Sequence, residues 1–166
     1  DGDSPGAIWE VPALGGAARR ITNSVGGADI SHDGARIVFP RLVDGRMELA
    51  VAARDASNLQ TIAPIQLGYY YLTPRWSPDD RLIAYQRGIS NAHEIFVVPS
   101  SGGQPRQITQ HGALIEGITW AATGDRLVFS SSQGATIWYL PPTNLWSIDA
   151  NGRNLRQLTF GEASYA

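Results

Sequence analysis

A ten-residue pattern occurs three times in this chain of 166 residues and constrains its fold more than any other feature. Each copy starts with a large apolar residue and a small residue, passes through a polar turn, and ends in an apolar run that closes on an aromatic residue. The copies begin at Ile30, Trp76 and Trp120, which lie 46 and 44 residues apart. A period of this length fits four short strands joined by tight turns.

A second, shorter pattern follows each copy and also opens the chain. It is an apolar segment, found at residues 8–12, 49–53, 95–99 and 145–149. The ninth residue after each segment is again Ile or Leu, and these residues are Ile21, Ile62, Ile108 and Leu158. The constant spacing predicts a third and a fourth strand in every repeat, after the two strands of the first pattern.

The turn residues and the polarity of the segments agree with this division. Asp33-Gly34 and Thr123-Gly124 separate a first strand from a second, and Gly102-Gly103 separates a third strand from a fourth. Such pairs are typical of tight hairpins. The second strand is apolar on both faces, as in residues 82–85, which predicts that it lies between two neighbouring sheets. The fourth strand is rich in Arg and Gln, as expected for an exposed edge.

The repeats therefore predict an all-β fold, a β-propeller of about three and a half four-stranded antiparallel blades. The predicted division is a half blade at 1–22, blades at 23–62, 63–109 and 110–159, and a lead into a next first strand at 160–166. Propellers close with about four to eight blades, so such a partial ring leaves two broad apolar faces in water. We expect closure by oligomerisation, for example of two copies, or by missing sequence.

Two stretches carry a resemblance to a known family. Residues 76–80 and 102–109 resemble the TolB-like, or WD-like Pro-Asp, β-propeller repeat. Asp80 replaces the Gly that is usual in that repeat, and Ala122-Thr123 replaces Pro-Asp. Residues 139–142, 145–146 and 157–162 resemble propellers fused to bacterial serine/threonine kinases or winged-helix regulators.

The resemblance implies a non-catalytic binding module with protein partners, of bacterial origin and in an extracytoplasmic or periplasmic location. Similar propellers also precede prolyl-oligopeptidase catalytic domains, where they filter substrates. Three hypotheses follow. The chain is a protein-interaction or sensory propeller, or an accessory substrate-filter propeller of a serine peptidase of that type, or a partial propeller that closes by binding identical copies of itself.

Charge and composition argue against several other classes. The formal net charge is -2 and no run of Lys or Arg is longer than Arg19-Arg20, so neither nucleic acid nor an anionic membrane surface is an expected partner. No apolar stretch reaches the roughly 18 residues of a membrane span. The chain has no Cys, no Gly-x-Ser-x-Gly motif and no phosphate-binding loop that ends in Gly-Lys-Ser or Gly-Lys-Thr. We therefore expect neither enzymatic activity nor a cofactor.

Five aromatic residues form the predicted binding surface. In antiparallel blades, the turn between the second and third strands and the crossing to the next blade lie on one rim. The residues that fall on this rim outside the repeat pattern are Tyr69, Tyr70, Tyr71, Trp138 and Tyr139. Tyr and Trp are favoured at protein interfaces. The alternative is that the same aromatic residues cap the blades and plug the central channel.

Metal sites are weaker hypotheses. His93 and His111, together with Glu116, fall on the same predicted rim, but no pair has the close spacing of metal ligands. We therefore predict that these histidines, and His32, are surface polar residues. Asp1-Gly2-Asp3 lacks the further carboxylates of a calcium loop and is predicted to form a turn.

Four of the five tryptophans recur at two positions of the repeat. Trp9 and Trp146 share a position in the third strand, and Trp76 and Trp120 share one in the first strand. This periodicity predicts packing roles for all four.

Overall fold

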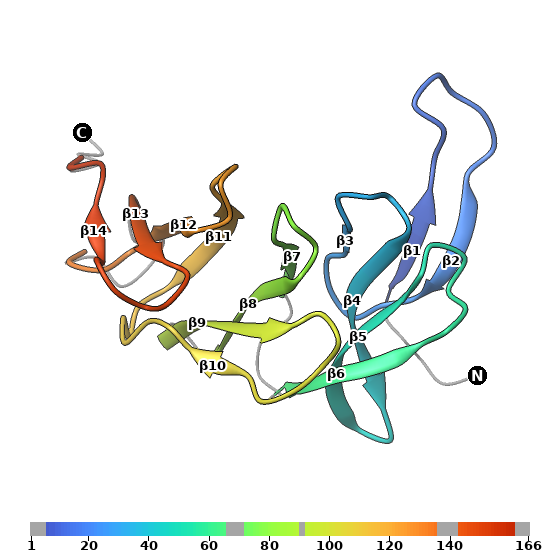
Figure 1. The fold of residues 1–166 in the computed structure, drawn as a ribbon, viewed down its shortest axis with the longest axis horizontal. Helices are drawn as coiled ribbons and strands as arrows, with labels where there is room; N and C mark the ends of the chain where they lie inside the picture. Colours follow the sequence, from blue (N-terminus) through green and yellow to red (C-terminus); the bar gives the residue numbers. More distant parts are fainter. Residues whose placement is uncertain (1–5, 66–71, 90–91, 136–142, 162–166) are drawn as a thin grey trace.

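The computed structural model describes residues 6–65, 72–89, 92–135 and 143–161, and every regular element in this part of the chain is a β-strand. Three sheets contain four antiparallel strands each, and one sheet contains two. The sheets follow one another in chain order, from β1 and β2 to β14, and the two ends of the row do not meet (Figure 1). The predicted all-β partial propeller is therefore confirmed.

The first sheet is a half blade made of β1 (Ala7–Glu10) and β2 (Arg19–Asn23). The second blade contains β3 (Asp29–Ile30), β4 (Arg36–Val43), β5 (Arg46–Ala53) and β6 (Gln60–Ile65). The third blade contains β7 (Arg75–Trp76), β8 (Leu82–Ile89), β9 (Ala92–Pro99) and β10 (Arg106–Gln107). The fourth blade contains β11 (Ile115–Trp120), β12 (Arg126–Ser131), β13 (Asn144–Asp149) and β14 (Arg156–Gln157). Among the described residues, no helix is long and apolar enough to cross a membrane.

Each blade is a meander in which neighbours in sequence are neighbours in the sheet. The fourth strand lies at one edge of every sheet, and the first strand lies at the other edge in the three four-stranded blades. The second strand is central and buried on both faces, as in β8, where Ile83, Ala84 and Tyr85 are all fully buried. Alternate residues of such a strand point to opposite faces, so each face packs on a different blade.

The apolar cores consequently lie between consecutive blades. The largest joins the second and third blades, and two others join the first to the second and the third to the fourth. Their central residues are Ile37 and Phe39 in the first core, Leu49, Ile83 and Tyr85 in the second, and Ile95, Leu127 and Phe129 in the third.

Asp80 replaces a Gly of the repeat, and the structure gives it a role. It lies in the turn between β7 and β8 with a φ of 57°, in the left-handed region that Asp tolerates better than most residues. Its carboxylate accepts hydrogen bonds from the backbone N–H groups of His32 (2.6 Å) and Asp33 (3.0 Å) in the second blade. Hydrogen bonds to an ionised acceptor are stronger than neutral ones, so this turn stabilises the contact between two blades.

Replacing Asp80 by asparagine should lower the free energy of unfolding by about 1–2 kcal/mol, because an amide offers one acceptor oxygen where the carboxylate offers two. Asn tolerates the same φ, so the change isolates the hydrogen bonds. Urea denaturation measures the effect. Asp44→Asn is the matched control, since Asp44 lies in the turn between β4 and β5 with a φ of 49°. An equal loss in both variants would contradict the role assigned to Asp80.

The tryptophans do not all pack as predicted. Trp76 is buried, and Trp120 and Trp146 pack against the inter-blade cores. Trp9, however, is 56% exposed, so its predicted packing role is wrong for the described chain. Its counterpart in the third blade, Phe96, packs on the core shared with the preceding blade. The described residues contain no blade before the half blade that could offer Trp9 the same contact.

Candidate binding site

The five aromatic residues predicted to form a binding rim, Tyr69, Tyr70, Tyr71, Trp138 and Tyr139, lie outside the described residues. Their role stays a prediction. The described part of the chain instead presents a candidate site at the open edge of the half blade, which we call the end slot.

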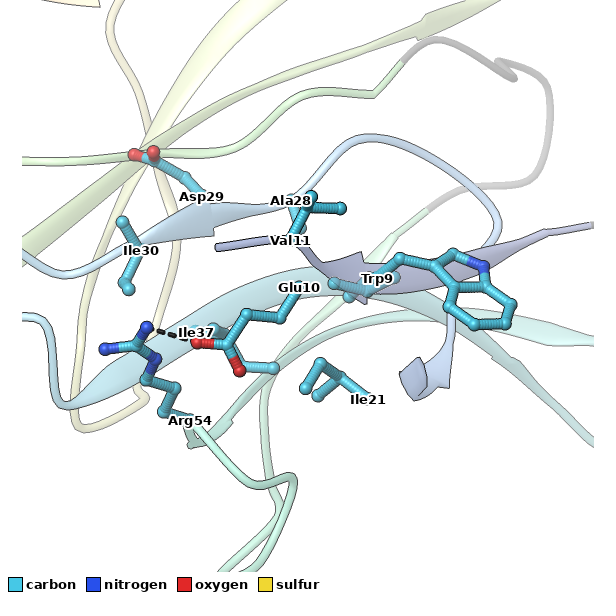
Figure 2. Close-up of a pocket in the computed structure, with 10 residues that line it drawn as sticks. Trp9, Glu10, Val11, Ile21, Ala28, Asp29, Ile30, Ile37 and Arg54 are labelled. Atoms are coloured by element: carbon cyan, nitrogen blue, oxygen red, sulfur yellow. Dashed lines mark hydrogen bonds and ion pairs between the residues drawn. The ribbon is translucent and has the colours of Figure 1, made fainter. Parts of the chain in front are cut away.

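The end slot is a cavity of about 360 Å³ between the half blade and the second blade. Figure 2 shows its lining side chains, which come from β1, β2, β3 and β4 and from residues that directly follow or precede a strand. The lining residues are Ile8, Trp9, Glu10, Val11, Ile21, Ala28, Asp29, Ile30, Ile37 and Arg54.

The topology explains why a hollow exists here. In the three complete blades the third strand is paired on both sides, with the second strand on its inner edge and the fourth on its outer edge. The strand β1 is a third strand by its position in the repeat, yet among the described residues it pairs only with β2. The end slot therefore lies where the first and second strands of this blade belong.

The wall of the slot is mainly apolar. Ile37 is buried, Ile8 and Ile21 are partly buried, and these residues belong to the core between the half blade and the second blade. An apolar wall beside an unpaired strand edge suits an extended segment with alternating apolar side chains, which gains backbone hydrogen bonds and buried surface together.

One end of the slot carries an ion-pair cluster. The Glu10 carboxylate contacts the guanidinium groups of Arg19, at 2.6 Å, and Arg54, which comes from the second blade (Figure 2). Hydrogen bonds from Arg19 and then Arg54 lower the pKa of Glu10 below its usual value. All three side chains are solvent-accessible, so the cluster contributes little to stability, but it fixes the position of Glu10 relative to the second blade.

Large apolar side chains are exposed at both ends of the row of blades. At the N-terminal end, Trp9 and Val11 of the half blade are more than half exposed. At the C-terminal end, Phe160 is 82% exposed, and Leu145 and Leu158 are also exposed. Exposed groups of large apolar side chains are found at interaction surfaces more often than elsewhere on a protein surface.

The prediction for the histidines is partly wrong. His32 is exposed, but His93 is fully buried and His111 is only 5% exposed. The backbone N–H of Ile115 donates a hydrogen bond to Nδ1 of the His93 ring at 3.1 Å. The same Nδ1 atom lies 3.3 Å from the carbonyl oxygen of Ile115. In the part of the chain that the structure describes, no three His, Asp or Glu side chains come together to form a metal site.

His111 is packed as an aromatic residue. Its ring meets those of Phe129 and Trp146 edge to face, with centroids 5.3 and 4.9 Å away. Neither ring nitrogen has a hydrogen-bond partner among the described residues. Burial lowers the pKa of His111 below its usual value, against the smaller opposing effect of Glu94. The Glu94 carboxylate instead accepts the backbone N–H groups of His111 and Gly112, each at 2.8 Å.

Sequence reasoning did not identify the end slot, although the sequence contained the signal for it. Residues 8–12 and Ile21 match the third and fourth strands of the repeat, and the given sequence contains no match to the first and second strands of that blade. The apolar wall could not be read in the same way, because it comes from residues that the repeat assigns to two different blades.

Comparison with known proteins settles the fold. The structure superposes on TolB from Agrobacterium tumefaciens with a TM-score of 0.71 over 91% of this chain, at 20% sequence identity. It superposes on TolB from Acinetobacter baumannii with a TM-score of 0.74 over 93% of this chain, at 15% identity. The fold is that of a TolB-like β-propeller. The resemblance seen in the repeat is thereby confirmed.

This TolB-like chain spans 55% and 37% of the lengths of those two TolB proteins. A structure described as one of two prolyl endopeptidases is also similar, with a TM-score of 0.64 over 94% of this chain and 26% of that protein, at 14% identity. No family model and no curated protein matches the sequence. The narrower resemblance to propellers fused to kinases or winged-helix regulators gains no support from these neighbours.

Proposed function

We propose that this chain is a protein-interaction segment of a TolB-like β-propeller and that its two open ends bind further propeller strands, in the simplest case those of a second copy. The observation that carries the proposal is the exposure of large apolar side chains at both ends, with Trp9 56% and Phe160 82% exposed. Covering them removes apolar surface from water, which is the main favourable term in protein association.

The unpaired edge of β1 supports the same proposal. An edge strand with free N–H and C=O groups recruits another strand unless it is short, charged or covered. The net charge of -2 offers little repulsion between copies of the chain. Edge pairing and apolar contact thus act together at the N-terminal end.

A charge placed at Trp9 tests this proposal. Trp9→Asp should weaken self-association at least tenfold, because it removes exposed apolar surface and places a carboxylate beside that of Glu10. Sedimentation velocity over a concentration series measures the association. Leu59→Asp is the control, since Leu59 is exposed near β6 and away from both ends. If both variants weaken association equally, the open end is not the interface.

The aromatic rim supports a second binding surface on the same segment, since Tyr and Trp dominate interface energetics. We expect Trp138→Ala to reduce partner capture by fivefold or more while leaving the far-UV circular dichroism spectrum and the unfolding midpoint unchanged. Trp138→Phe, which keeps an aromatic ring, serves as its control and should retain most of the binding. Unchanged binding by Trp138→Ala would leave the rim with a packing role only.

The similarity to a prolyl endopeptidase favours one alternative, an accessory substrate-filter propeller of a serine peptidase. The coding sequence that follows Ala166 distinguishes the two functions. A catalytic hydrolase domain there supports the filter, and further propeller repeats support the interaction segment.

A further inference from the structure

We propose that the interface between the third and fourth blades is an acid-sensitive contact, which opens locally when the buried ring of His111 takes up a proton. The interface between the second and third blades, which has apolar residues at the same positions of the repeat, stays closed over the same pH range. The inference does not depend on the proposed function of the open ends, because it concerns an interface inside the chain.

Comparison of the two interfaces shows where they differ. In the second blade, Met47 and Ile65 pair across β5 and β6 and are buried in the core shared with the third blade. The first two copies of the ten-residue pattern begin 46 residues apart, and the positions 46 residues after Met47 and Ile65 are His93 and His111. Both histidines are buried. The third–fourth interface therefore carries two titratable rings where the preceding interface carries aliphatic side chains.

The surroundings of His111 suit only its neutral form. The ring comes from the segment that leads out of the third blade, and it contacts the rings of Phe129 and Trp146, which pair across β12 and β13 of the fourth blade. A neutral imidazole packs there as one more aromatic ring. A protonated imidazole carries a charge and two N–H donors, and neither ring nitrogen has a partner among the described residues. Protonation therefore favours an arrangement in which the blades separate and water reaches the ring.

Glu94 is the charged group that opposes this effect. It lies on β9, and its carboxylate accepts the backbone N–H groups of His111 and Gly112, each at 2.8 Å, rather than an N–H of the imidazole. Burial lowers the pKa of His111 more than the charge of Glu94 raises it. The ring contacts from β12 and β13 are Phe129 and Trp146, which carry no charge. The neutral, closed form consequently prevails above about pH 6.5 and is lost below it.

The other polar side chains of this interface have hydrogen-bond partners. On β9, Nδ1 of His93 accepts the backbone N–H of Ile115 at 3.1 Å. On β8, the Gln86 side chain is 1% exposed, and its Nε2 donates to the carbonyl oxygen of Glu116 at 3.3 Å. The side chain of Glu116 itself is exposed on β11. His111 is thus the titratable group of the interface whose ring nitrogens lack partners among the described residues.

Single cysteines can report on each interface, because the chain has no cysteine of its own. Ser131→Cys places a thiol in the third–fourth interface, since Ser131 is fully buried and shares a face of β12 with Phe129. Ala63→Cys places a thiol in the second–third core, where Ala63 is 2% exposed. The rate of thiol labelling, divided by the rate for the same chain unfolded in urea at the same pH, measures how often each interface is open.

Acid should open one interface and not the other. Between about pH 7.5 and 5.5, the normalised labelling rate at Ser131→Cys should rise about five- to tenfold, close to the limit for one histidine proton. The rate at Ala63→Cys should change less than about twofold. Neither rate should depend on the concentration of the chain, because the opening takes place within one copy.

The repeat supplies the matched variants. His111→Ile gives the third–fourth interface the residue of the preceding one, and it should reduce the rise at Ser131→Cys to less than about twofold. His93→Met is the control, and it should retain most of the rise, because His93 is hydrogen-bonded. The reverse change, Ile65→His, should confer a rise of several-fold on Ala63→Cys. Circular dichroism checks that each variant folds, and His111→Phe replaces His111→Ile if the latter does not.

Three results would overturn the inference: an equal rise at both thiols, an undiminished rise in the His111 variants, or loss of the rise in His93→Met alone. The first of these would mean that acid unfolds the whole chain rather than one interface. A chain that is monomeric and shows the rise at Ser131→Cys alone supports this inference and contradicts self-association. An oligomer without that rise contradicts this inference and leaves self-association standing.

Discussion

Replacing Phe129 by alanine should lower the free energy of unfolding by about 3–5 kcal/mol, the range for large aromatic residues in protein cores. Phe129 is 1% exposed and lies at the centre of the core between the third and fourth blades. It pairs across strands with Ile118 and Trp146, and its ring contacts that of His111. Neighbouring side chains on three strands cannot all move to fill the cavity, so most of the cost should remain.

Urea denaturation followed by circular dichroism measures this loss, with an unchanged m-value as the sign that the unfolded ensemble is the same. Leu42→Ala is the control, because Leu42 is exposed near the β4–β5 turn and away from both ends of the row. It should cost less than about 1 kcal/mol. Similar losses in the two variants would mean that the blades do not share the core described above.

Acid should destabilise the chain through His111 before it affects the carboxylates. Burial lowers the pKa of His111 in the folded state, so the unfolded chain binds a proton more readily. The stability that neutral His111 contributes is fully present above about pH 6.5, the pKa of a histidine in the unfolded chain. This contribution is lost as the pH falls from 6.5 through the lower pKa that His111 has in the folded state. The slope for one proton is at most about 1.4 kcal/mol per pH unit.

The carboxylates act in a lower window. Hydrogen bonds lower the pKa values of five acids, which are Glu10, Asp33, Glu48, Asp55 and Asp79. Their contribution is present above their unfolded pKa values, near 4, and is lost below that pH. The pH range from about 6.5 down to 5 therefore lies above the range in which these five acids are protonated.

His111→Phe is the matched variant for this range, since phenylalanine keeps the edge-to-face contacts with Phe129 and Trp146 and has no ring nitrogen to protonate. It should be at least as stable as the natural chain at neutral pH, because it also removes two buried nitrogens without partners. Urea midpoints at several pH values measure both proteins. A slope as steep in His111→Phe as in the natural chain would show that another group controls acid unfolding.

The blade structure could be predicted because every blade of a propeller contains the same four strands and the same short turns. The ten-residue pattern and the later Ile or Leu appear at constant spacing, and their polarity separates a central second strand from a polar outer strand. Turn residues such as Gly34 and Gly124, with φ near 70°, mark the same hairpins in the sequence and in the structure. These signals are local, and each was present in several copies.

Properties that depend on contacts between blades could not be predicted in this way. Asp80 looked like a departure from the repeat, because the amides that it binds are 47 and 48 residues away in sequence. His111 looked like a surface residue, since nothing nearby in sequence indicates that its ring meets Phe129 and Trp146. Trp9 was predicted to pack and is 56% exposed, because periodicity identifies a position that contacts the preceding blade and the described residues contain no such blade.

The most direct test of the central claim is the solution mass of the unmodified chain, measured by size-exclusion chromatography with light scattering. Open apolar ends and an unpaired β1 edge predict a discrete multiple of 17.9 kDa, with a dimer as the simplest case. A mass of 17.9 kDa at every concentration, together with cooperative unfolding, would contradict the claim that the open ends bind other copies of the chain.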